Sequence, residues 1–115
     1  MTFVEDVLPV IVGVLFVITG GVKVLGVRQS LEIRDHFNMS PTLWRVVGVL
    51  ETSGGVGALV GTQVAVLGLL GAIGLTALMV GAIASRIRVR DPLYAIASDA
   101  VVLAATVVTA VLFAA

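Results

Sequence analysis

The sequence contains four long apolar runs, and each has about the 20 residues that an α-helix needs to cross a bilayer. They cover residues 7–27, 43–61, 64–85 and 92–115. A chain of 115 residues with 59% hydrophobic residues is a poor candidate for a water-soluble fold, because a chain of this size buries only about two-thirds of its surface. We therefore expect an all-α integral membrane protein, a four-helix bundle forming one transmembrane domain over residues 1–115.

The basic residues predict how the bundle is oriented. The segments 28–42 and 86–91 connect helices on one side of the membrane, and all seven basic residues lie in or beside them: Lys23, Arg28, Arg34, Arg45, Arg86, Arg88 and Arg90. Under the positive-inside rule these loops face the cytoplasm, so that both termini face out (N-out/C-out). The excess of arginine over lysine amid abundant Ala, Val and Gly is typical of a GC-rich bacterial genome. We expect a multi-pass protein of the bacterial inner membrane.

The first basic loop carries a short stretch that could form a helix at the membrane interface. It covers residues 28–37, and its apolar residues Ile33 and Phe37 are four positions apart, which places them on one helical face. This spacing predicts a short interfacial helix.

Composition excludes several kinds of chemistry. The chain has no cysteine and one histidine, His36, so thiol chemistry, iron–sulfur ligation and bis-histidine haem ligation within the chain are excluded. The net charge is zero, whereas nucleic-acid binding calls for a positive excess. We predict no metal site, no intrinsic cofactor and no nucleic-acid partner.

Glycines are frequent in the two central runs, and two patterns resemble those that let membrane helices approach closely. These patterns are Gly57-x-x-x-Gly61 and Gly54-x-x-x-Ala58. One interpretation is packing within the bundle, and the other is association into a homo-oligomer. The sequence leaves both open.

Two carboxylates lie well inside the predicted spans. At 1.5 Å per residue, Glu51 is about 12 Å and Asp99 about 10 Å from the basic side. A charge at the centre of a membrane helix costs about 2.5–3.5 kcal/mol unless it is paired. Lys23 is close enough to the same side for its amine to reach the interface, and Arg45 and Arg86 mark helix ends there.

The neighbours of these charges at helical spacing predict which faces turn inward. One inward face joins Phe16, Thr19 and Lys23, and another joins Met79 and Arg86. We expect a polar cluster in which Glu51 and Asp99 meet Lys23 and at least one arginine. The cluster is either a network of ion pairs that fixes helix register or the floor of a ligand pocket. The candidate residues of that pocket are Phe16, Thr19, Lys23, Arg45, Glu51, Met79, Arg86 and Asp99.

Three short motifs resemble a known family. They read Phe16-x-x-x-Gly20-x-x-Lys23-x-x-Gly26, then Ser40-Pro41-x-Leu43-x-Arg45-x-x-Gly48-x-x-Glu51, then Met79-x-Gly81-Ala82 followed by Arg88 and Asp91. Together they resemble the DoxX-like family of small four-helix membrane proteins over nearly the whole chain. The resemblance implies a four-helix bundle and an association with quinone-linked or oxidative-stress redox systems. Relatives often carry a histidine after the Gly-Ala pair, about where Arg86 stands here.

Three functions remain open at this point. The first is an accessory subunit that binds a lipophilic small molecule, with a quinone as the candidate. It would work with a redox partner protein that carries the cofactor. The second is a membrane-embedded enzyme in which Glu51 and Asp99 act as acid and base on a lipophilic substrate, in an isomerisation, epoxide opening or cyclisation. The third is a structural or transport partner protein.

Overall fold

The computed structural model describes residues 3–115 as five helices and no strands. Four are long: α1 (Phe3–Leu25), α3 (Pro41–Val60), α4 (Ala65–Arg88) and α5 (Leu93–Ala114). Each of the four is long and apolar enough to cross a membrane. This confirms the predicted all-α architecture with four candidate spans.

The helix ends differ from the predicted ones by a few residues, for local reasons. α1 ends at Leu25 rather than at residue 27 because Gly26 has a φ of 70°, a left-handed conformation that glycine adopts without steric cost. α3 begins at Pro41 rather than at residue 43 because the Ser40 hydroxyl caps it, accepting from the Leu43 N–H at 3.1 Å. Proline suits the first turn, where its missing N–H has no helical partner.

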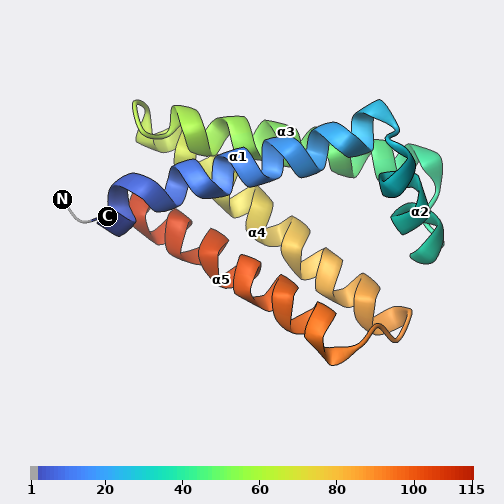
Figure 1. Ribbon diagram of the computed structural model, residues 1–115. Coiled ribbons are helices and arrows are strands. Elements are labelled where there is room, and N and C mark those ends of the chain that lie inside the picture. The colour runs from blue at the N-terminus through green and yellow to red at the C-terminus, as the bar shows by residue number, and fades with distance from the viewer. Residues whose placement is uncertain (1–2) are drawn as a thin grey trace.

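The predicted short helix in the first basic loop is present as α2 (Arg28–His36). It lies at the same end of the bundle as the turn between α4 and α5, whereas the start of α1, the end of α5 and the α3–α4 turn lie at the other (Figure 1). We call the first of these the basic end, because it carries the seven basic residues, and the second the terminal end.

Helices α1 and α3, α3 and α4, and α4 and α5 pack closely in turn, whereas α1 and α5 touch much less. Glycines allow the close approaches. A Cβ at Gly55 would lie 2.7 Å from the Gly13 carbonyl oxygen of α1, and one at Gly71 would lie 2.8 Å from the Gly54 carbonyl oxygen of α3. Packing within the bundle therefore accounts for Gly55 and Gly54 of α3, which face α1 and α4 respectively.

The bundle opens from one end to the other. The pair α1 and α3 lies close to the pair α4 and α5 at the terminal end, and the two pairs diverge toward the basic end (Figure 1). A buried core of Val12, Phe16, Leu75 and Met79 joins them part-way along. The outward faces remain apolar, with exposed residues such as Ile18 and Val101, as expected of surfaces that contact lipid rather than water.

Candidate functional site: a cavity between two helix pairs

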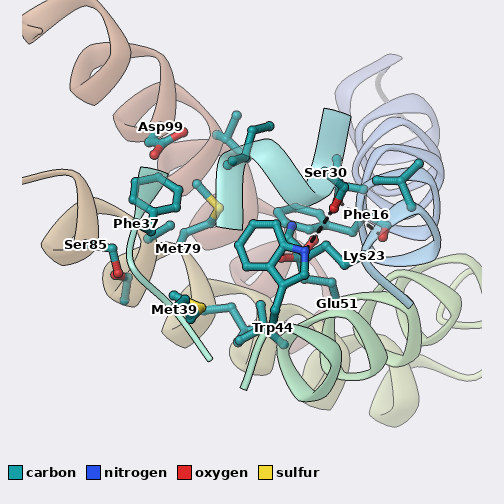
Figure 2. Close-up of a pocket in the computed structure, with 18 of the residues that line it drawn as sticks. Phe16, Lys23, Ser30, Phe37, Met39, Trp44, Glu51, Met79, Ser85 and Asp99 are labelled. Carbon is teal, nitrogen blue, oxygen red and sulfur yellow. Dashed lines mark hydrogen bonds and ion pairs between the residues drawn. The ribbon is translucent and has the colours of Figure 1, made fainter. Parts of the chain in front are cut away.

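The divergence of the helix pairs leaves a cavity of about 550 Å³ toward the basic end. All five helices contribute to its wall, and most of the lining side chains are apolar or aromatic. Figure 2 shows Phe16, Trp44 and Met79 on this wall together with the polar groups Lys23, Glu51 and Asp99. A mostly apolar cavity with a few convergent polar groups is typical of a small-molecule site.

The first polar group on the wall is an ion pair between α1 and α3. Lys23 Nζ lies 2.6 Å from Glu51 Oε1, and the Thr19 hydroxyl donates to Glu51 Oε2 at 2.7 Å. Glu51 is only 7% exposed. Both carboxylate oxygens therefore have partners, as a buried charge requires.

Small residues on both helices make this short pair possible. A Cβ on Gly20 would lie 2.5 Å from the Gly48 carbonyl oxygen, so a larger residue there would push α1 away from α3. Lys23 is one turn beyond Gly20, and Glu51 is one turn beyond Gly48. The two glycines thus set the helix separation at which the amine reaches the carboxylate. Lys23 Nζ also lies 5.0 Å from the centroid of the Trp44 ring, within the range of a cation–π contact.

The second polar group joins α4, α5 and the turn between them. The Arg86 guanidinium binds Asp99 through Nε, and its Nη1 donates to Asp91 Oδ2 at 2.9 Å. His36 of α2 contacts the other oxygen of Asp91, with 2.5 Å between Nε2 and Oδ1. The result is a continuous chain of four charged or titratable groups from the half-exposed His36 to Asp99 on the cavity wall.

Asp91 lies in the α4–α5 turn, outside the spans, and its surroundings favour the charged carboxylate. The hydrogen bond with His36 is the largest influence lowering the pKa of Asp91, and the bond from Arg86 lowers it further. Desolvation acts in the opposite direction and is outweighed. Asp91 is therefore held ionised over a wider pH range than a free aspartate.

Helix α2 lies across the basic end and is attached to both helix pairs. Near its start, Trp44 Nε1 of α3 donates to the buried Ser30 hydroxyl at 2.9 Å. At its other end, Arg88 of α4 donates to the Phe37 carbonyl oxygen at 2.6 Å, beside the His36–Asp91 contact. Ser30, Ile33 and Phe37 line the cavity. The loop helix is thus part of the site.

The structure brings most of the predicted site residues to this cavity. The residues that line it are Phe16, Thr19, Lys23, Glu51, Met79, Arg86 and Asp99. Arg45 is not among them and is exposed on α3, because the neighbouring Trp44 occupies the inward position and successive helical residues point about 100° apart. The expected single polar cluster is divided: Glu51 pairs with Lys23, and Asp99 pairs with Arg86.

Sequence reasoning missed several residues that shape the site. Ser30, Phe37 and Trp44 line the cavity, and His36 and Asp91 complete the second polar group. Trp44 could have been found, since a tryptophan near a helix end beside charged residues is typical of the membrane interface. No local pattern indicates that His36 meets Asp91, because the two are far apart in the chain and in separate loops.

The polar groups on the cavity wall include hydrogen-bond donors that a ligand could use. Over residues 3–115 there is no group of three or more His, Cys, Asp or Glu side chains that could hold a metal ion. Lysine has three N–H donors and arginine five. The bonds described above use only some of those on Lys23 and Arg86, so donors remain for a ligand.

The profile of the DoxX-like family matches residues 7–109, which is most of the chain. The chain belongs to the DoxX-like family. The resemblance inferred from the three short motifs is thereby confirmed, and this DoxX-like protein is a multi-pass membrane protein with four candidate spans. No curated protein and no solved structure matches the chain.

Proposed function

We propose that this DoxX-like protein binds a lipophilic small molecule with a hydrogen-bonding polar head, and that a quinone is the first ligand to test. One observation carries the proposal: the cavity is mainly apolar, yet Lys23 and Arg86 bring cationic donors to it from different helix pairs. Quinone oxygens are hydrogen-bond acceptors, which is the complement of these donors. The ring would lie among Phe16, Trp44 and Met79.

The chain provides its own reporter for this test, because Trp44 is its only tryptophan and lines the cavity. A quinone bound there should quench Trp44 fluorescence by contact. Protein in lipid nanodiscs would be titrated with a benzoquinone, using a redox-inactive aromatic ring of similar size as the optical control. Saturable quenching by the benzoquinone is expected; quenching that only rises linearly with quinone concentration would contradict binding.

Two glycines of α4 give a matched pair of variants. A Cβ added at Gly81 or at Gly74 would meet nothing within 4 Å, so both positions can accept a larger side chain. Gly81 lines the cavity and Gly74 does not. Gly81→Leu should therefore weaken quinone quenching strongly, whereas Gly74→Leu should leave it unchanged. Equal effects would show that the quenching does not report this cavity.

The role in redox metabolism and the topology belong to the same proposal. The chain would hold the quinone for a redox partner protein that carries the cofactor, with the basic end facing the cytoplasm. Reporter fusions at the C-terminus would test the orientation, and crosslinking followed by mass spectrometry would seek the partner and any second copy of the chain. A C-terminal reporter active in the cytoplasm would reverse the proposed topology.

An enzymatic function is the second candidate, because Glu51 and Asp99 line the same cavity from different helices. One carboxyl group could donate a proton to a lipophilic substrate while the other accepts one. Glu51→Gln and Asp99→Asn should then each abolish turnover while the protein stays folded. Organic extraction of the purified protein would supply the candidate substrate, and full turnover in both variants would reject this function.

A further inference from the structure

We propose that the ligand is an amphiphile with a long hydrocarbon chain, and that this chain leaves the cavity sideways into the bilayer between α1 and α5. This inference rests on the proposed function and specifies the class of ligand. It follows from three features of the cavity: the order of cationic donors and apolar groups along the membrane normal, the open seam between two helices, and the cavity volume.

The cationic donors of the wall and its deepest apolar residues lie at different depths. Lys23 and Arg86 are each within one turn of the helix ends at the basic end. Leu15, Leu78 and Val102 also line the cavity, and they lie about 14–15 Å from those ends at 1.5 Å per residue. This is near the middle of a hydrocarbon core of about 30 Å. A ligand that matches the wall has its polar head near the basic end and its apolar part at the bilayer centre.

The seam between α1 and α5 offers the apolar part a way out. Among the four long helices, these are the neighbours that pack least against each other. Figure 1 shows them close together at the terminal end and diverging toward α2. Leu15 and Val22 of α1 and Val102 of α5 line the cavity, and Leu15 is 39% exposed. Aliphatic side chains therefore border the opening from both helices.

The size of the cavity makes an exit necessary for a long chain. A volume of about 550 Å³ lies within the range of about 300–1,000 Å³ that holds a drug-sized molecule. It accommodates a substituted ring and the first part of a side chain. The rest of an isoprenoid or acyl chain would extend through the seam, where lipid tails solvate it at no cost in exposed apolar surface.

The test compares two quinones with one head group, one without a side chain and one with a long isoprenoid chain. Val102→Phe would narrow the seam, and the adjacent Val101→Phe is the matched control, since Val101 is 70% exposed and does not line the cavity. Leu15→Phe narrows the same seam from α1, as a second variant in case one fails to fold. Binding in nanodiscs is read from Trp44 quenching, corrected for partitioning into lipid.

We expect Val102→Phe and Leu15→Phe to weaken the binding of the long-chain quinone by about tenfold, a change of about 1.4 kcal/mol in binding free energy. The chainless quinone should bind these variants as it binds the unaltered protein, and Val101→Phe should affect neither probe. An equal loss of affinity for both quinones would overturn the proposed exit between α1 and α5, because the phenylalanine would then only be filling the cavity. A selective loss for the long-chain quinone in Gly81→Phe alone would place the exit between α3 and α4 and would also overturn it. If neither quinone quenches Trp44 in the unaltered protein, the proposed function itself fails.

Discussion

The two ends of this four-helix bundle are built from the same helices but held together by different forces. At the terminal end, Gly61 and Gly68 meet backbone to backbone beneath the Phe113 ring. At the basic end the helix pairs are apart. Each pair is held by its own ion pair, and α2 bridges the space between the two pairs. The stability of the terminal end therefore depends on residue size, and that of the basic end depends on charge.

This difference has a physical origin in the membrane as a solvent. Between membrane helices there is little hydrophobic driving force, so close contact depends on small residues that allow van der Waals packing. Charged residues inside a membrane need partners, and here each finds one within its own helix pair, Glu51 with Lys23 and Asp99 with Arg86. The terminal end is closed by small residues, whereas the basic end encloses a cavity between the two pairs.

The largest expected effect is from breaking the Lys23–Glu51 pair. Lys23→Met leaves Glu51 buried with only the Thr19 hydroxyl as its described partner, and removing one member of a buried pair costs about 3 kcal/mol. The free energy of unfolding would be measured by denaturant titration in mixed micelles. Arg45→Met, at an exposed position of the same end, should change it little. Similar losses in both variants would show that the pair does not stabilise the basic end.

The terminal end should respond to size instead. In Gly61→Ala the added Cβ would lie 2.7 Å from Phe113 Cζ, and overpacking of this kind costs about 1–3 kcal/mol. In Gly81→Ala, toward the basic end, the added Cβ meets nothing within 4 Å. The higher helix propensity of alanine should therefore stabilise the protein by up to about 1 kcal/mol. Shifts of opposite sign in the melting temperatures of the two variants would confirm that only the terminal end is limited by residue size. A stabilising Gly61→Ala would contradict it.

Helix α2 gives a smaller effect, localised to the basic end. Ser30→Ala removes the acceptor of the Trp44 indole N–H, and losing one such hydrogen bond costs about 1 kcal/mol. Hydrogen exchange should become faster in α2 while α4 and α5 keep their protection. Ser98→Ala is the control, because the exposed Ser98 bonds only a carbonyl of its own helix in the described structure. Unchanged exchange in α2 would mean that Ser30 does not hold it.

The smallest effect is a pH dependence from the α4–α5 turn. Because the folded-state pKa of Asp91 is lowered, mainly by His36 and then by Arg86, its stabilisation is present above the unfolded pKa of about 3.9. It is lost as the pH falls through the lower folded value. Thermal unfolding would be followed from neutral to strongly acidic pH. The melting temperature should decline with pH, and Asp91→Asn should reduce this decline whereas Asp35→Asn should not. The same decline in all three proteins would assign it to other groups.

Much of the fold could be predicted because its signals are local. Each of the four apolar runs lies within a single segment, and the periodicity that turns Phe16 and Glu51 inward needs only one helix. The patterns Gly54-x-x-x-Ala58 and Gly57-x-x-x-Gly61 likewise indicate a close helix contact without showing which helix is the partner. Local signals therefore predicted the elements, their inward faces and part of the cavity lining.

The pairing of the charges was beyond these signals. Glu51 and Asp99 lie at similar depth, and nothing in the spacing of either helix shows that one meets Lys23 and the other Arg86. The position of Arg45 outside the cavity depends on which neighbour α3 faces, a property of the assembled bundle. The same holds for His36 and Asp91, which approach each other only because α2 crosses the basic end.

By itself, the sequence determined that this chain has four membrane-length helices with its positive charge at one end, because hydropathy and charge position need no knowledge of tertiary contacts. The tertiary structure decided that the helix pairs diverge, that α2 bridges them and that two separate ion pairs face one cavity. These features depend on helix separation and rotation. Both are set by contacts such as Gly20 against Gly48 and Gly61 against Gly68, which join residues distant in the chain.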